Sequence, residues 1–446
     1  MKKKIVYIFL FIFIVIFIMS FKLSLQINNF NENEVMRSIN YLSSDVFKGR
    51  LAGTFENKIC AAYIRDQFKQ NGLKPYTKDY YENFPVTFPK LLPGKPFLKV
   101  FNNKGNLIKQ YVYGTDYKED MLSFKQNKIC FNYNNKITYG SSYIKVSSGG
   151  NIFVFYCPEN NNISFRSSYS QNSPIALLIL ISKKTYNDFK NLLADGCSID
   201  CSVPCTESKT NINNVIGYIQ GKDNKLPPII ISAHFDHLGE DFSSNIYSGA
   251  LDNASGISFV LEMTKYIKSL GVPERNIIFI GFNAEEFGLL GSNYFVDRYK
   301  NEVKSSEVFN FDMIGSNAVP LSIVGGKNDN KNTGLIKDLS KICIDSKIKY
   351  NCLFEDASDH ASFRKFGIDA VTFCDSDMSK IHTPFDKPQN ISKTAIKNCF
   401  TVFSKELLPL AFKHNYFILY SNQIWMFSLG ICITLTIFLI YKDIYK

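Results

Sequence analysis

Proline and glycine are sparse in this chain, with 15 and 25 copies in 446 residues. That scarcity excludes a collagen-like or low-complexity polypeptide. Charged residues make up 20% of the sequence and hydrophobic residues 45%, so the composition also excludes an intrinsically disordered chain. The length suffices for one large domain or for two to three average ones. We therefore expect a folded interior.

Signals for nucleic-acid binding are also missing from the sequence. The formal net charge is +11, but several of the lysines lie at the two ends of the chain, and the others are dispersed among asparagines, as in KNDNKN. No zinc-finger, RNP-type or P-loop pattern accompanies them. A solvated surface accounts for this charge, and we expect no nucleic-acid partner.

The 11 cysteines give no thiolate metal site. Cys197, Cys201 and Cys205 are regularly spaced, but zinc sites normally pair two-residue-spaced cysteines with a second matching pair, which the sequence lacks. We expect structural or disulfide roles for them. Ten cysteines lie outside the second apolar run described below, an even number that is compatible with disulfides in an oxidising compartment.

Two apolar runs, residues 5–21 and 424–441, are long enough to be considered as membrane spans. The first follows Lys2, Lys3 and Lys4, and we predict an uncleaved anchor in preference to a removed signal. The second is apolar on every face and is predicted to be a transmembrane helix. Because lysines favour the cytosolic side, the segment between the runs should lie in a lumen, outside the cell or in a periplasm. A lipid bilayer is thus an expected partner.

The remaining pattern divides the chain into blocks. Residues 31–76 carry helical periodicity, including a helix at 56–70. Short β-like runs such as 151–156 and 176–181 then predict an inserted β-rich module. From residue 214 onward, buried strands alternate with amphipathic helices. This alternation is typical of an α/β fold whose mostly parallel central sheet is flanked by helices.

The predicted boundaries follow from these blocks. In the α/β part, strands are expected at 228–233, 276–282 and 308–311, and helices at 255–270, 288–299 and 334–346. The expected division is 1–25 for the N-terminal anchor or signal, 26–83 for the first part of the α/β domain, 84–210 for the inserted module, 211–415 for the main part, and 416–446 for the C-terminal transmembrane helix and tail.

Histidines and carboxylates cluster where the predicted strands end. Ligands collect beyond the carboxyl ends of strands in open α/β sheets, and four of the five histidines follow such strands or lie in the later loops. Imidazoles and carboxylates are the ligands of zinc sites that keep a position open for water. Two histidines and three carboxylates, one of them bridging, would hold two divalent ions. The strand-end residues are His234, Asp236, His237, Asp252, Glu285, Glu286 and Asp312, and His382 follows later.

Six strings in this order, SAHFDHLGE, GALDNASG, FNAEEFGLLGS, FNFDMIG, SDHASFRKFGIDAVTF and IHTPFDKP, resemble the zinc aminopeptidase family. That family includes bacterial leucyl aminopeptidase, aminopeptidase Y and glutamate carboxypeptidase. LSSDVFKGRLAG, YIRDQFKQNGLKPY and NVIGYIQGKD are also similar to family segments. The resemblance covers residues 31–76 and 211–410, and it implies a phosphorylase/hydrolase-like zinc peptidase fold, two zinc ions per chain and peptide substrates.

The resemblance also implies roles for single residues. One zinc would be held by His234, Asp252 and Glu286, and the other by Asp252, Asp312 and His382, with Asp252 as the bridge. Glu285 would be the general base, and Asp236 would orient His234 through its other ring nitrogen. Ile381 departs from the pattern, because many relatives have a tyrosine before the last metal histidine.

The leading hypothesis is therefore a membrane-anchored dizinc metallopeptidase of the aminopeptidase type. A serine hydrolase is disfavoured because no Gly-x-Ser-x-Gly elbow is present. Two alternatives share the fold: a non-catalytic receptor or scaffold, and a glutaminyl-cyclase-like acyltransferase that works with a single zinc. The intact ligand set favours catalysis. The choice among aminopeptidase, carboxypeptidase and dipeptidase stays open, as does the oligomeric state.

Overall fold

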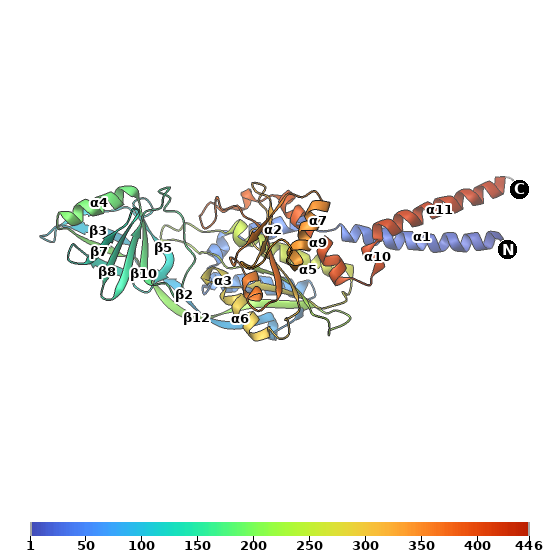
Figure 1. The fold of residues 1–446 in the computed structure, drawn as a ribbon, viewed down its shortest axis with the longest axis horizontal. Helices are drawn as coiled ribbons and strands as arrows, with labels where there is room; N and C mark the ends of the chain where they lie inside the picture. Colours follow the sequence, from blue (N-terminus) through green and yellow to red (C-terminus); the bar gives the residue numbers. More distant parts are fainter. Residues whose placement is uncertain (1, 445–446) are drawn as a thin grey trace.

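The computed structural model describes residues 2–444. The molecule is elongated, with a β-rich module at one end, an α/β domain in the middle, and two long helices at the other end (Figure 1). The two helices come from opposite ends of the sequence and lie side by side. The α/β domain lies between these helices and the module.

The central sheet has nine strands in the order β1-β12-β14-β13-β15-β18-β16-β17, with β2 paired to β12. The middle strands β14, β13, β15 and β18 run parallel, whereas β12 and β16 pair antiparallel with their neighbours β14 and β18. The expected mostly parallel sheet is thus confirmed in its middle and is mixed at its margins. The strands are β1 (Lys74–Pro75), β2 (Tyr81–Leu91), β12 (Cys205–Ile219), β13 (Ile229–His234), β14 (Ile277–Phe282), β15 (Glu307–Phe311), β16 (Leu321–Gly325), β17 (Tyr350–Phe354) and β18 (Asp369–Asp375).

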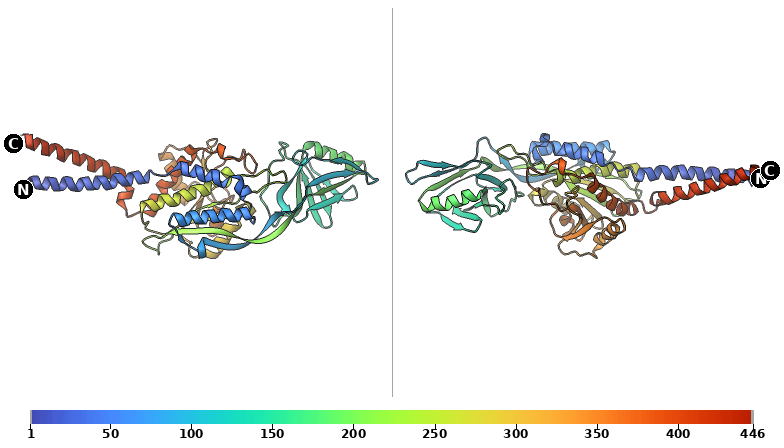
Figure 2. Two further views of the ribbon diagram at one scale, coloured as in Figure 1. Left: turned by 180° about the vertical axis from the view of Figure 1, so that it is seen from behind. Right: turned by 90° about the horizontal axis from the view of Figure 1, so that it is seen from above.

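Helices cover both faces of this sheet because its central strands are apolar on both sides. Along β13, Ile229 and Ile231 pack into one core and Ile230 into the other, as the alternation of side chains on a strand requires. Figure 2 shows α2, α3 and α5 together on one side. That side carries α2 (Glu32–Leu42), α3 (Phe55–Gln70), α5 (Gly256–Leu270), α7 (Gly334–Asp345) and α9 (Lys393–Ala411), and the other carries α6 (Leu290–Tyr299) and α8 (His360–Arg364).

Most expected elements are found within two residues of their predicted limits. The α5 helix ends where the sequence indicated, because Gly271 adopts a φ of +105°, which side chains rarely allow. Upstream, the peptide between Asp252 and Asn253 is cis.

The inserted module consists of two further sheets and one helix. A five-stranded sheet has the order β5-β10-β9-β8-β7, and a four-stranded sheet has the order β4-β3-β11-β6. The long antiparallel pair β2 and β12 joins the module to the α/β domain, and the expected boundaries at 84 and 210 fall inside these two strands. The module comprises β3 (Phe97–Phe101), β4 (Leu107–Gln110), β5 (Tyr117–Phe124), β6 (Lys128–Phe131), β7 (Lys136–Tyr139), β8 (Tyr143–Ser148), β9 (Asn151–Tyr156), β10 (Ile175–Ile181), α4 (Lys183–Ala194) and β11 (Ser198–Ser202).

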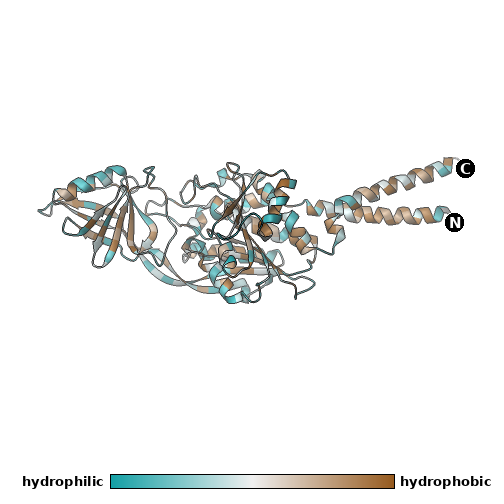
Figure 3. Ribbon diagram, viewed as in Figure 1, coloured by the Kyte–Doolittle hydropathy of each residue, from teal (hydrophilic) through white to brown (hydrophobic). Residues whose placement is uncertain are grey.

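The two apolar runs form the helices α1 (Lys2–Ile27) and α11 (Ser421–Ile444), and the short helix α10 (Tyr416–Leu419) leads into the second. Both are hydrophobic along most of their length (Figure 3), and both are long and apolar enough to cross a membrane. They pack against each other near the α/β domain. There the ring of Phe21 lies 5.6 Å from that of Trp425, and Ser24 Oγ donates to Asn422 Oδ1 at 2.6 Å.

All 11 cysteines are unpaired within residues 2–444. The disulfides considered from the even cysteine count are therefore not observed in this structure. Cys197, Cys201 and Cys205 are buried in the core of the module, among apolar side chains such as Ile199 and Val203. Their burial fits the expected structural role.

Candidate metal centre

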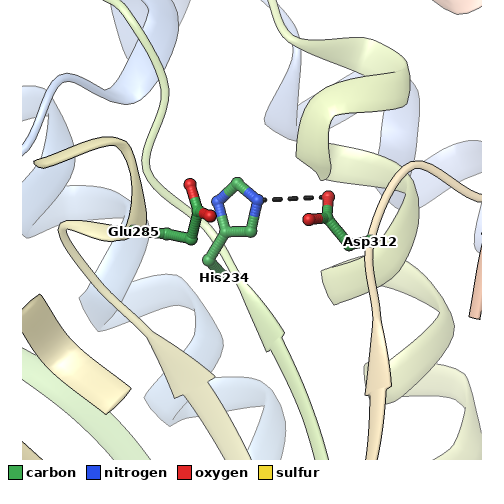
Figure 4. Close-up of side chains that lie close together, drawn as sticks. All are labelled: His234, Glu285 and Asp312. Carbon is green, nitrogen blue, oxygen red and sulfur yellow. Dashed lines mark hydrogen bonds and ion pairs between the residues drawn. The ribbon is translucent and has the colours of Figure 1, made fainter. Parts of the chain in front are cut away.

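The parallel strands bring the expected ligands to one edge of the sheet. His234 ends β13, Asp312 follows β15 directly, and Glu285 begins a short 3-10 turn, η4 (Glu285–Phe287), just after β14. Because β14, β13 and β15 are parallel neighbours, their carboxyl ends share this edge. Figure 4 shows the carboxyl groups of Glu285 and Asp312 on opposite sides of the His234 ring.

The first cluster surrounds His234. Its Nε2 atom lies 3.2 Å from Asp312 Oδ1 and 3.5 Å from Asp252 Oδ1. His234, Glu285 and Asp312 each offer one ligand atom, and these atoms lie within 4.8 Å of one another. His234, Asp252 and Asp312 are buried, whereas Glu285 is partly exposed. This is a nitrogen and oxygen donor set of the kind that zinc accepts.

The second cluster surrounds His382. Its Nε2 atom lies 3.3 Å from Asp252 Oδ2 and 3.4 Å from Glu286 Oε2. Asp252 therefore faces one imidazole with each of its two oxygens, which is the geometry of a bridging carboxylate.

This pairing differs from the expected one. The family resemblance grouped His234 with Glu286 and His382 with Asp312, whereas the structure puts His234 beside Asp312 and His382 beside Glu286. The reason lies in η4. Its turn aims Glu285 at His234 and the next side chain, Glu286, at His382. Strand-end position alone does not reveal which of two adjacent glutamates faces which histidine.

His237 joins the second cluster, although sequence analysis gave it no role. Its Nδ1 atom lies 2.9 Å from Glu286 Oε1 and 3.8 Å from Asp252 Oδ2, and the ring is fully buried. Its position right after Asp236 in a strand-end loop, in a chain with five histidines, was the available signal. His237 is thus a third imidazole at the site.

Asp236 is hydrogen-bonded to η4, the turn that carries Glu285 and Glu286, and not to His234. Its Oδ1 atom lies 3.7 Å from His234 Nδ1, which is beyond hydrogen-bonding distance. Its two oxygens instead accept hydrogen bonds from the backbone N–H groups of Glu285 and Glu286, at 3.1 and 3.2 Å. The expected orienting contact is therefore electrostatic, and the direct effect of Asp236 is to hold the turn that carries both glutamates.

Two further residues fix the loop of Asp252, and sequence analysis missed both. Asp386 accepts hydrogen bonds from the backbone N–H groups of Leu251 and Asp252, at 2.8 and 3.0 Å. Asn253 is buried, and its side chain donates to Phe311 O at 2.9 Å, so it ties this loop to the end of β15. Both lie inside strings that resemble the family, GALDNASG and IHTPFDKP, and that resemblance was the available signal, although it assigned them no role.

Two further polar residues near the site, Ser358 and His360, are held by hydrogen bonds. Ser358 Oγ donates to Asp312 Oδ2 at 2.8 Å, so the hydroxyl fixes a candidate ligand. The His360 ring is bonded to Glu355 O at 2.9 Å and to Thr372 Oγ1 at 2.8 Å, which satisfies both of its nitrogens.

The crowded carboxylates disturb the protonation of the site. Burial raises the pKa of Glu285 well above its usual range, and Glu286 and Asp312 add to the effect, while His234 opposes it. Burial opposes the charged form of His382, yet Glu286 and Asp252 raise its pKa to about 11. The charged imidazole of His382 thus offsets part of the negative charge of Glu286 and Asp252. A divalent cation would supply that balance directly, so the donor set fits a metal.

A cavity of about 250 Å³ adjoins the clusters. Leu251, Met313 and Ile381 line it, and each is a direct sequence neighbour of a candidate ligand. Asp377 and Lys380 add charged groups to its wall. The residue that replaces the expected tyrosine, Ile381, therefore contributes apolar surface to the space beside His382.

The fold itself, a mixed sheet flanked by helices, matches that of solved zinc aminopeptidases. Residues 214–407 match the model of Peptidase family M28, and this segment is a domain of that family. This match confirms the resemblance of the six strings to the zinc aminopeptidase family.

Individual relatives agree with this assignment. The chain is 36% identical over 197 residues to "Aminopeptidase YwaD" of Bacillus subtilis (strain 168), over 41% of each chain. It is 33% identical over 120 residues to "Vacuolar membrane protease" of Meyerozyma guilliermondii, over 26% of this chain and 12% of that one. The chain thus spans less than half the length of either relative. The crystal structure of BSAP, a zinc aminopeptidase from Bacillus subtilis, shares the fold, with a TM-score of 0.58 and 19% identity over 86% of this chain and 96% of that one.

The two bonds to Asp236 predict the effect of Asp236→Asn. The amide replaces one acceptor oxygen by a donor that faces a backbone N–H, so the glutamate turn should loosen. We expect zinc affinity to fall by about 10- to 100-fold, the usual cost of losing a partner that orients ligands. Zinc titration against a competing chelator measures this. Asp297→Asn, at an exposed position of α6, is the control, and equal affinity in the two variants would contradict the role given to Asp236.

Proposed function

We propose that this protein is a membrane-anchored dizinc metallopeptidase that acts as an aminopeptidase-type exopeptidase. One observation carries the proposal: the two oxygens of Asp252 face two different imidazoles, at 3.5 and 3.3 Å. A carboxylate between two histidines, each with its own further carboxylate, supports a pair of ions and not a single one.

The proposed ligands follow from these contacts. One ion is held by His234, Asp252 and Asp312, and the other by Asp252, Glu286 and His382, with His237 beside Glu286. When bound, two zinc ions supply Lewis acidity toward the peptide carbonyl and toward a nucleophilic water. The chain's own contribution is to fix this donor set in a buried site with one partly exposed carboxyl, that of Glu285.

Glu285 is the proposed general base. Its neighbour Glu286 is buried against His237 and His382, whereas Glu285 faces His234 and is partly exposed. A carboxyl with a raised pKa takes a proton from the attacking water and can return it to the leaving amine. The division of labour between two adjacent glutamates thus rests on their different surroundings.

The cavity beside His382 is the proposed site for a substrate residue. Its wall combines the apolar side chains of Leu251, Met313 and Ile381 with Asp377 and Lys380. A peptide side chain packed there would place its peptide bond near both clusters. Two of the relatives described above, an aminopeptidase and a vacuolar membrane protease, support peptides as the substrates.

Membrane anchoring is proposed from α1 and α11. Both helices are long and apolar enough to span a bilayer, and one relative is a vacuolar membrane protease. The lysines near the outer ends of the two helices favour a cytosolic location for those ends. The catalytic domain would then lie on the non-cytosolic side.

Removal of the metal tests the proposed chemistry. We expect about two zinc ions per purified chain, with peptide hydrolysis lost on treatment with a chelator and recovered with zinc. Metal analysis and product identification by mass spectrometry measure this. A metal-free chain with full turnover would refute the proposal, and one zinc per chain with cyclised N-terminal glutamine as the product would favour the glutaminyl-cyclase alternative.

Substitution of the two glutamates separates their roles. Glu285→Gln should lower kcat by about 10²- to 10⁴-fold, the typical contribution of general acid–base catalysis, while two zinc ions stay bound. Glu286→Gln should lose zinc at one site and regain activity in part with excess zinc. Glu159→Gln, exposed in the module, is the control. Loss of zinc from Glu285→Gln alone would reverse the assignment.

Protease protection tests the topology. In sealed vesicles with the cytosolic face outward, added protease should leave residues 31–413 intact, and detergent should expose them. Digestion of this segment in sealed vesicles would place the catalytic domain on the cytosolic side and contradict the proposal.

A further inference from the structure

The loop between β9 and β10 carries part of the inserted module to the metal centre. Residues 164–169 of this loop, here called the strap, contact Glu286, His382 and the loop that follows β13. We propose that the strap holds Glu286 and His382 in position for the metal, which makes Ser168 a positioning residue of the site. This inference rests on the proposed function.

Ser168 holds the side chain of Glu286. Its Oγ atom donates to Glu286 Oε2 at 2.6 Å, and this is the same oxygen that lies 3.4 Å from His382 Nε2. His237 Nδ1 lies 2.9 Å from the other oxygen, so both oxygens of Glu286 are fixed. The backbone N–H of Tyr169 also donates to Glu286 O at 3.0 Å. Two consecutive strap residues thus hold this glutamate by its side chain and by its backbone.

The strap holds His382 in the same two ways. The ring of Phe165 stacks on the imidazole at 5.6 Å between centroids, with 29° between the planes. The backbone N–H of Arg166 donates to His382 O at 3.0 Å. His382 has a φ of +56°, a left-handed conformation that side chains other than glycine rarely adopt without support. The strap supplies part of that support.

Buried polar contacts make the strap itself rigid. Arg166, only 2% exposed, donates to Leu238 O at 2.7 Å and to Glu240 O at 2.9 Å, both in the loop after β13. It also pairs with Glu119 of β5 at 3.2 Å. Tyr247 donates from its hydroxyl to Ser164 O at 2.7 Å. Since the strap is fixed to both the module and the α/β domain, its hydroxyl can hold a ligand with little freedom.

A different result is expected if the strap has only a structural role. If these contacts only attach the module, loss of the Ser168 hydroxyl would lower stability and leave zinc binding unchanged. If Ser168 positions Glu286, the same change would weaken one zinc ion and leave the metal-free fold as it was. The two roles are therefore separable by measuring zinc affinity and metal-free stability on the same variants.

The experiment uses the full chain in detergent, with zinc titrated against a competing chelator and thermal unfolding followed without metal. For Ser168→Ala we expect one of two zinc ions to bind about 10- to 100-fold more weakly, with the metal-free Tm unchanged. Ser168→Thr retains a hydroxyl and should restore the affinity. Ser170→Ala should bind as the wild type does, because the contacts of Ser170 with Leu122 and Ser173 are made by its backbone.

Phe165→Ala provides a second test. Phe165 is 38% exposed, so its truncation opens no core cavity, and we expect it to weaken the same ion as Ser168→Ala. Wild-type affinity in both variants, or equal weakening of both ions, would overturn the inference. Those results would leave the proposed function intact as long as the wild-type chain binds two zinc ions. A wild-type chain that binds no zinc would refute the proposed function itself.

Discussion

Asp252, Glu286 and Asp312 are buried carboxylates that meet at one edge of a sheet, and the surrounding structure offsets their charge. Buried charges are costly unless they are paired or bind a metal. Imidazoles lie between the carboxylates, and the hydroxyls of Ser168 and Ser358 donate to Glu286 and Asp312. The fold must therefore offset the negative charge of these carboxylates, and a divalent cation would neutralise what remains.

The central elements were predictable from the sequence because buried parallel strands are continuous apolar runs. The strand expected at 276–282 is β14, and the helix expected at 255–270 is α5, each within one residue. The strand ends then located His234 and Asp312, because ligands gather at the carboxyl edge. The Peptidase family M28 match confirms the family that the motifs resembled.

The parts of the site that were not predictable depend on side-chain direction and on irregular loops. The sequence could not say that Glu285 faces His234 while Glu286 faces His382, since this is set by the η4 turn. Ser168 lies more than a hundred residues before Glu286, in a loop without periodicity, so no pattern connected the two. Asp386 lies in the string IHTPFDKP, but its role was not predictable, because its partners are backbone N–H groups, which every residue except proline carries.

The side-by-side packing of α1 and α11 has a consequence for how the protein can leave a membrane. If both helices span the bilayer as proposed, the catalytic domain is tethered at each of its two ends. A single cut beside Trp425, or beside Phe21, would leave it attached through the other helix. Release of the domain in soluble form would then need two separate cleavages, so this arrangement would keep the domain at the membrane.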